Sequence, residues 1–257
     1  MKGWPAGYAS PPDQLARLAD VRRAVRKGRK IRRVLEEELG PAPWPDVRGL
    51  DLGCGPGAIA AYLAKIAGAF VGLDVDEAAI EAARARFRYP NLDFVYEKSP
   101  RLPFDDAAFD LIIVNHVYEH ARDAGTMFAE VRRLLKPTGL VYLAAAGKYQ
   151  IFEPHYRLPF LSWLPHAWAN LYLKLAGHNE RYDVALLSYR RLFKLISPFH
   201  VREYTAAVVR DPRKFAAADV VPRWPPLQRL LAAAARLAPA VAPTRIFVLS
   251  RRGDDDR

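Results

Sequence analysis

The chain has 257 residues and a net charge of +11, and 51% of its residues are hydrophobic, so it can bury a sizeable core and wholesale disorder is excluded. No apolar run reaches the roughly 20 residues that span a bilayer, and no apolar signal segment follows the start. The single cysteine, Cys54, excludes an intrachain disulfide, so we expect a cytoplasmic protein.

The positive charge lies on the two flanks of the chain. Residues 1–50 carry a net charge of +5 and residues 151–257 carry +8, whereas residues 51–150 carry −2. Such asymmetry suits an anionic partner, which could be an acidic substrate, a phospholipid surface or nucleic acid. An arginine-rich composition can also do no more than solvate the surface, so the charge alone does not name a partner.

The first predicted element is a basic helix over residues 13–39, which ends at Gly40-Pro41. We assign residues 1–44 to an N-terminal arm and this helix. Three roles stay open for the helix: a solvated cover over a ligand entrance, a contact for an anionic substrate or membrane, and a contact for RNA. RNA has the least support, because the sequence contains no recognisable RNA-binding module and the helix has no interleaved aromatic residues.

Residues 45–147 alternate short apolar strands with helices. Strands are predicted at VRGLDLG, AFVGLDV, LDFVYE, FDLIIVN and GLVYLAAA, with helices between most of them. This alternation is typical of parallel βαβ units with right-handed crossovers and helices on both faces. We therefore predict an α/β fold, a doubly wound Rossmann-like sheet.

The pattern changes after residue 147. Residues 148–199 are rich in aromatic residues and proline and predict a helical cap, inserted before the last two strands. A strand pattern returns at 200–210 and 244–252, and 211–243 reads as helix interrupted by prolines. We assign residues 200–257 to the completion of the core domain.

Three glycines, Gly53, Gly55 and Gly57, follow the first strand in LDLGCGPG. A parallel sheet binds ligands at the carboxyl ends of its strands, and glycine allows a tight turn and close approach of the backbone to a ligand. A phosphate-binding P-loop would continue with Lys and Ser or Thr, but Ala58 follows here. A dinucleotide motif is matched formally through Ala58, although Asp51 occupies a strand position that is usually apolar in that motif.

Four stretches together resemble a known family. The glycine loop, VGLDVD at 71–76, RLPFDDAAFDLIIVNHVYEH at 101–120 and LLKPTGLVYLA at 134–144 are similar, in order and spacing, to class I S-adenosylmethionine-dependent methyltransferases, particularly the small-molecule group of the ubiquinone-biosynthesis C-methyltransferases. The resemblance covers residues 45–147 and the last two strands. It implies a mostly parallel sheet with an antiparallel last strand, S-adenosylmethionine as cofactor, and methyl transfer by in-line displacement to a small-molecule or lipid-like acceptor (quinone, lipid, glycan or phenol).

The resemblance also implies a cofactor site at the strand ends. Asp74 would accept hydrogen bonds from the ribose hydroxyls, Val75 would lie along the adenine, and Asp51 would hold the amino-acid end. Cys54 is interpreted as a small residue that fills the turn, since nothing marks it as an activated thiolate. The predicted cofactor-binding residues are Asp51, Gly53, Cys54, Gly55, Gly57, Asp74, Val75, Ser99, Asn115 and His116.

One stretch departs from the family pattern. Where the family usually has GDA, with its aspartate near the adenine amine, this chain has EKS at 97–99. Lys98 cannot accept a hydrogen bond, so adenine recognition would fall to Ser99 or Glu97.

A general base helps if the acceptor is a hydroxyl, whereas an amine or an activated carbon can do without one. His155, where the cap begins, and His116, at the end of the fourth strand, are the candidate bases, and a fixed base can also be absent. No Cys or carboxylate spacing supports a metal site. The predicted acceptor pocket consists of Tyr156, Arg157, Phe160 and Trp163, unless these aromatics only pack the core of the cap.

Several alternatives stay open. The cap and the basic flanks could touch an anionic membrane, which would make the protein cytoplasmic with peripheral attachment. The chain could instead be a non-catalytic S-adenosylmethionine-binding scaffold, an RNA methyltransferase or an NAD-linked oxidoreductase. The sequence does not fix the oligomeric state.

Overall fold

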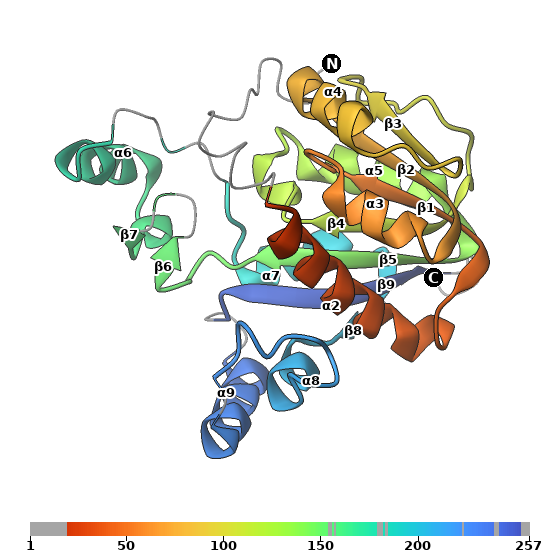
Figure 1. Cartoon of the computed structure of the whole chain (residues 1–257). Helices are drawn as coiled ribbons and strands as arrows, with labels where there is room; N and C mark the ends of the chain where they lie inside the picture. Colours follow the sequence, from red (N-terminus) through yellow and green to blue (C-terminus); the bar gives the residue numbers. More distant parts are fainter. Residues whose placement is uncertain are drawn as a thin grey trace.

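A seven-stranded sheet forms the centre of the structure (Figure 1). The computed structural model describes residues 20–153, 156, 158–178, 182, 185–222, 224–238 and 242–252. The strands of this sheet are β1 (Trp44–Leu52), β2 (Ala67–Asp74), β3 (Leu92–Tyr96), β4 (Phe109–Asn115), β5 (Leu135–Ala146), β8 (Phe199–Glu203) and β9 (Thr244–Arg251). Their order is β3-β2-β1-β4-β5-β9-β8, and only β9 runs antiparallel to its neighbours. The predicted fold class, including the antiparallel last strand, is confirmed.

The order of the strands reverses between β1 and β4, so a crevice for ligands is expected at their carboxyl ends. Leu52 of β1 is in register with Leu73 on one side and with Val114 on the other. The glycine loop, the end of β2 and the end of β4 therefore meet at one edge of the sheet.

Helices cover both faces of the sheet (Figure 1). On one face lie α2 (Val21–Leu39), α3 (Ala58–Ala64), α4 (Glu77–Arg86) and α8 (Thr205–Arg210), which share a core with the sheet. On the other face lie α5 (Ala124–Leu134) and α7 (Tyr189–Ile196). The helix α7, which falls in the range assigned to the cap, buries Leu192 and Ile196 in the core of the sheet.

A smaller unit projects beyond the end of β5 (Figure 1). It consists of β6 (Phe152–Glu153), β7 (Leu158–Pro159), η2 (Leu161–Trp163) and α6 (His166–Leu175). Leu161, Ala169, Leu173 and Tyr182 form its own apolar cluster. The chain returns from this unit past η1 (Tyr118–His120), where Ala185 N donates to the Glu119 carbonyl at 2.9 Å.

Three segments differ from the sequence-based expectation. Of the basic helix expected over residues 13–39, α2 begins at Val21 and is capped by Asp20, whose side chain accepts from Arg23 N at 3.2 Å, and residues 13–19 lie outside the described part of the chain. The expected strand over 200–210 ends at Glu203 and continues as α8, because Thr205 turns its hydroxyl to Ile246 N and Val208 then enters the core at helical spacing. Helix in 211–243 is confined, among the described residues, to α9 (Pro225–Leu237).

Within the described part of the chain, no helix combines the length and the apolar character needed to cross a membrane.

Candidate functional site

The glycine loop turns away from β1 with all three glycines in the left-handed region, at φ values of +72° for Gly53, +51° for Gly55 and +76° for Gly57. They do not serve the same purpose. A Cβ at Gly53 would lie 2.6 Å from the Val117 side chain, and one at Gly57 would lie 2.4 Å from the Phe94 ring. A Cβ at Gly55 would meet nothing within 4 Å. Packing therefore requires Gly53 and Gly57, whereas Gly55 presents bare backbone to open space.

Asp74 at the end of β2 holds this loop in place. Its Oδ2 accepts a hydrogen bond from Gly55 N at 2.7 Å, and its Oδ1 accepts one from Asp76 N at 2.9 Å. Each carboxylate oxygen has a second lone pair, so the group can still accept hydrogen bonds from a ligand. Asp76 caps α4 by accepting from Ala78 N and Ala79 N, so the helix start does not depend on Asp74.

Asp51 is 2% exposed, next to the loop on β1. Its carboxylate interacts with the Ala60 backbone, but its Oδ2 is buried without a hydrogen-bond partner. Burial, followed by the charge of Asp74, raises the pKa of Asp51 to about 8. A buried acceptor that lacks a donor is costly, and a ligand ammonium group would supply both the donor and the opposite charge.

Cys54 fills the turn, as its sequence context suggested. Its thiol is buried 3.4 Å from the Gly55 carbonyl oxygen. Burial and the two nearby carboxylates raise the pKa of Cys54, so the sulfur stays a thiol and is no nucleophile.

The EKS stretch has its polar groups engaged with one another. Ser99 N donates to Glu97 Oε1 at 2.6 Å, and Ser99 Oγ accepts from Arg101 N at 3.3 Å. The ammonium group of Lys98 lies 4.9 Å from the centre of the Tyr96 ring and faces solvent. Val75 is half-buried at the other side of Asp74. The hydroxyl proton of Ser99 and the Oε2 atom of Glu97 are not used in these hydrogen bonds, so both residues can still contact an adenine.

At the end of β4, His116 lies beside a buried acid. His116 has a left-handed backbone (φ +58°), which is strained for a residue other than glycine. Its Nδ1 lies 3.1 Å from Oε1 of Glu119, which is fully buried. Hydrogen bonding from His116 keeps the pKa of Glu119 low despite the opposing effect of burial, so Glu119 is an ionised acceptor. In the hydrogen bond to this acceptor, Nδ1 is the donor, which leaves Nε2 as the ring nitrogen that faces a ligand.

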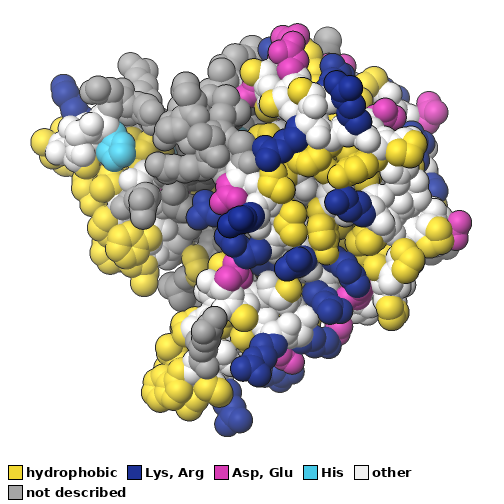
Figure 2. Space-filling view, in the orientation of Figure 1, with side chains coloured by type: hydrophobic (Ala, Val, Ile, Leu, Met, Phe, Trp, Pro, Cys, Tyr) yellow, Lys and Arg dark blue, Asp and Glu magenta, His cyan; other side chains and the backbone are white. Residues whose placement is uncertain are grey.

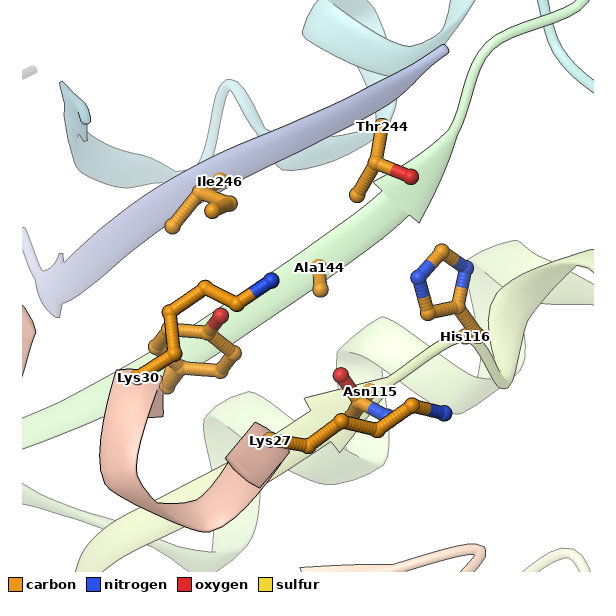
Figure 3. Close-up of a pocket in the computed structure, with 8 residues that line it drawn as sticks. Lys27, Lys30, Asn115, His116, Ala144, Thr244 and Ile246 are labelled. Carbon is orange, nitrogen blue, oxygen red and sulfur yellow. The ribbon is translucent and has the colours of Figure 1, made fainter. Parts of the chain in front are cut away.

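A small cavity of about 40 Å³ opens at this strand end, beneath α2 (Figure 3). Its lining residues are Lys27, Lys30, Asn115, His116, Tyr142, Ala144, Thr244 and Ile246. Asn115 and His116, which sequence reasoning placed near the reacting atoms, are thus brought together. The described residues contain no cluster of His, Cys, Asp and Glu side chains that could hold a metal ion.

The predicted acceptor pocket is not assembled at this cavity. His155 and Arg157 lie outside the described residues. Tyr156 packs against the rings of His178 and Tyr182 in the projecting unit, each at 5.8 Å. Phe160 and Trp163 are 49% and 43% exposed and pack edge to face at 5.3 Å.

Sequence reasoning missed four residues of the site: Lys27, Lys30, Glu119 and Thr244. The spacing of three between His116 and Glu119 was the available signal for that pair. Nothing in the sequence distinguishes the two lysines from the other cations of α2, because what sets them apart is the face of the helix that packs on the sheet.

Residues 50–143 match a family described as the methyltransferase domain. This part of the chain is therefore similar to a methyltransferase domain. A phthiotriol/phenolphthiotriol dimycocerosates methyltransferase of Mycobacterium tuberculosis is 39% identical over 95 residues, which is 35% of this chain and 34% of that protein. A ubiquinone biosynthesis O-methyltransferase of Pelagibacter ubique is 28% identical over 163 residues, 60% of this chain and 65% of that protein. The aligned part thus spans about a third of the mycobacterial relative.

The methyltransferase fold extends beyond the matched residues. The solved structure of the plantazolicin methyltransferase BpumL, in complex with a substrate analogue and SAH, covers 94% of this chain and 91% of its own, with a TM-score of 0.58. Its sequence identity of 15% supports the fold alone. The unpaired Oδ2 of Asp51 and the open space at Gly55 are features that S-adenosylmethionine fits, through its ammonium group and its flat nucleoside.

Asp51 should make cofactor binding depend on pH. Because the pKa of Asp51 is about 8, the free methyltransferase must release a proton below pH 8 before this carboxylate can hold an ammonium group. We expect the affinity for S-adenosylhomocysteine, measured by calorimetry, to rise by up to about tenfold per pH unit between roughly pH 6 and 7.5. Asp51→Asn should weaken binding and flatten this dependence.

The same variant has a second readout in the unliganded protein. A carboxyl group whose pKa is raised by folding binds more protons folded than unfolded, so its contribution to stability falls as the pH rises from about 4 to about 8. The melting temperature of Asp51→Asn should therefore exceed that of the wild type most at pH 8 and less at pH 5. A variant that melts lower at pH 8, with an unchanged pH slope of binding, would contradict this account.

Proposed function

We propose that this chain is an S-adenosylmethionine-dependent methyltransferase that acts on a small-molecule or lipid-like acceptor. The observation that carries the proposal is the arrangement of Asp51, Gly55 and Asp74, with one unpaired buried carboxylate oxygen and open space at bare backbone. The relatives named for dimycocerosates and for ubiquinone biosynthesis support a lipid-like or quinone acceptor.

In this proposal the chain's own residues hold the cofactor as follows. Asp51 binds the ammonium group, Asp74 accepts from the ribose hydroxyls while keeping Gly55 N, and Val75 borders the adenine. Ser99, Asn115 and His116 complete the contacts, and Gly53, Cys54 and Gly57 shape the loop. When bound, the cofactor supplies a methyl group on a cationic sulfur, which is already activated as a leaving group.

His116 is the base that the geometry favours for a hydroxyl acceptor. Glu119 fixes the proton on Nδ1 and compensates the charge of the ring when Nε2 takes a proton from the acceptor. Lys27 and Lys30 of α2 line the same cavity as His116 (Figure 3). His155 keeps its place as a second candidate, and Tyr156, Arg157, Phe160 and Trp163 as candidate acceptor contacts from the cap (residues 148–199).

The alternatives fit the site less well. The pyrophosphate of NAD would lie against the loop, where Asp51 and Asp74 are buried side by side, and their charges would repel it. A scaffold without activity would have no use for a histidine oriented by a buried acid. RNA binding has no support from the aromatic residues of the described structure, because none is interleaved with the cations of α2.

The cofactor assignment is tested by titrating S-adenosylmethionine and NAD separately into the protein. S-adenosylmethionine should bind with a dissociation constant in roughly the micromolar range, and Asp74→Ala should weaken binding by about tenfold or more, because a good hydrogen bond to a charged group is lost. Asp74→Asn keeps an acceptor for Gly55 N, so it separates loss of the ribose contact from collapse of the loop. The exposed Asp105 supplies the control variant Asp105→Ala.

Transfer of labelled methyl groups to cell-extract compounds, followed by mass spectrometry, identifies the acceptor. Binding of NAD in place of S-adenosylmethionine would overturn the proposal.

The base assignment is tested on a hydroxyl acceptor found in that screen. His116→Ala should lower kcat by about a hundredfold or more, with partial recovery on adding imidazole. Glu119→Gln should lower kcat by a smaller factor while leaving KM near its wild-type value, because the ring loses its orientation and charge compensation. Unchanged kcat in both variants would mean that the acceptor needs no base or uses another one.

We also propose that the protein works in the cytoplasm with peripheral contact to an anionic membrane. Exposed apolar side chains gather over the projecting unit and over α9, on the side where the strands β1 to β5 end (Figures 1 and 2). These are Ile151, Phe152, Phe160, Trp163, Trp168, Leu171 and Leu175 in the unit, and Trp224, Leu230, Leu231 and Leu237 at α9. Lysine and arginine side chains lie over α2, to the right of both groups in this view (Figure 2), and such cations attract acidic headgroups.

Vesicle sedimentation tests this contact. Vesicles of phosphatidylglycerol and phosphatidylcholine should retain the protein, and the double variant Trp168→Ser/Leu175→Ser should reduce the bound fraction by about fivefold, since each exposed side chain buries apolar area in the bilayer. Phe193→Ser, which changes an exposed aromatic residue on α7, is the matched control. Equal retention of all three proteins, or no retention of the wild type, would contradict the proposal.

A further inference from the structure

The cavity beneath α2 has a pronounced electrostatic bias. Two cationic side chains, Lys27 and Lys30, and the hydroxyl-bearing Thr244 line it, and none of the described lining residues is a carboxylate (Figure 3). Both lysines are half-buried and sit three residues apart, so they share one face of the helix. They extend from α2 across the ends of β4 and β5, toward the cavity that His116 also lines (Figure 3).

The position of these lysines is fixed by the packing of α2. Gly28, directly between them in sequence, lets the helix approach α3 so closely that a Cβ would lie 2.6 Å from the Tyr62 ring. At the other end of the helix, Glu37 pairs with Lys214 at 2.6 Å and Glu38 accepts from Tyr204 Oη at 2.6 Å. The two ammonium groups are therefore held over the strand ends and do not simply extend into solvent.

Lys27 and Lys30 differ from Arg26 and Arg32, two other cations of α2, in having no ion-pair partner among the described residues. Arg26 pairs with Asp219 at 3.2 Å, and Arg32 pairs with Glu36 at 2.8 Å. Neither Lys27 nor Lys30 forms an ion pair with any residue that the structure describes. Burial lowers the pKa of Lys27 and of Lys30. The charges of Asp51 and Glu119 act on Lys27 and that of Asp219 acts on Lys30, but two partly buried ammonium groups that share a cavity and form no ion pair are still better accommodated when an anion joins them.

The size and chemistry of the cavity restrict that anion. At about 40 Å³ the cavity is small, so a single headgroup is the part of an acceptor that we expect to enter it. Lysine ammonium groups and the Thr244 hydroxyl are donors suited to a carboxylate or phosphate oxygen.

We propose that this cavity binds an anionic oxygen group, a carboxylate or a phosphate, of the methyl acceptor through Lys27, Lys30 and Thr244. The inference rests on the proposed methyltransferase function and narrows its substrate class to acidic acceptors. The anion would anchor the acceptor beside His116, so that a neighbouring hydroxyl meets Nε2. Lys30 gives the clearer test of anion binding. Replacing Lys27 would also change the electrostatics of Asp51 and Glu119, whose charges act on it, whereas the acid that acts on Lys30 is Asp219.

Direct binding is tested first, with benzoate and inorganic phosphate as probes for the two headgroups. Each is titrated into the full chain saturated with S-adenosylhomocysteine, with ligand-observed NMR as the readout. The wild type should bind at least one probe, and Lys30→Gln and Lys30→Met should each weaken that binding by about tenfold, the usual effect of losing a charge-assisted contact. Arg29→Gln removes the same charge from an exposed position of the same helix and should leave binding unchanged. Preference for one probe assigns the headgroup.

Turnover is tested next, with 3,4-dihydroxybenzoate compared with catechol, which lacks the carboxylate. The wild type should favour the acid in kcat/KM, and Lys30→Gln should reduce that preference by about tenfold by raising KM. Loss of probe binding on adding S-adenosylhomocysteine would overturn the inference, because the cavity would then serve the cofactor carboxylate. An equal loss in Arg29→Gln, or no probe binding by the wild type, would overturn it too. Failure of S-adenosylhomocysteine itself to bind is a separate result, and it would count against the proposed function.

Discussion

The hydrogen bond from Gly55 N to the Asp74 carboxylate is the contact on which the site depends. It joins the loop after β1 to the end of β2. These two strands are neighbours in the sheet, and α3 lies between them in the sequence. With this bond in place, all three glycines of the loop have a left-handed backbone conformation, and Gly55 faces open space. A side chain at Gly53 or Gly57 would collide with Val117 or Phe94, so packing within the protein requires glycine at these two positions. Only at Gly55 is the requirement left to a ligand.

Placing Asp74 there has an electrostatic consequence for Asp51. Burial and the proximity of Asp74 both disfavour a charge on Asp51, and its Oδ2 lacks a donor. The free protein thus carries a destabilised acid at its centre, and a cationic ligand would relieve that destabilisation on binding. Folding stability and ligand affinity are therefore linked through the same group.

The sequence was sufficient for the fold because the repeated strand and helix periods agree with the hydrophobic core. Asp74 and Asp51 could be located from strand ends alone, since the parallel register brings the ends of β1, β2 and β4 to one edge. Thr205 shows the limit of this reasoning. The stretch TAAVV, which begins at Thr205, is compatible with both a strand and a helix, and the hydrogen bond that Thr205 Oγ1 accepts from Ile246 N favours the helix. The lysines of α2 could not be assigned to the site for a related reason. The sequence predicts the helix but does not say which of its faces packs on the rest of the protein, which Gly28 determines by its contact with Tyr62.

The site is thereby divided by charge. Carboxylates gather where β1 and β2 end, at Asp51 and Asp74, and ammonium groups gather where α2 crosses β4 and β5, at Lys27 and Lys30. His116 stands at the boundary, tied to the buried Glu119. For the proposed donor and acceptor, opposite fields on the two sides favour one orientation, because the reversed arrangement places like charges together in a medium that screens them poorly. A fixed orientation is what in-line transfer requires, since the reaction needs the acceptor atom on one side of the methyl group and the leaving sulfur on the other. The division of charge can therefore supply alignment that no single catalytic side chain provides.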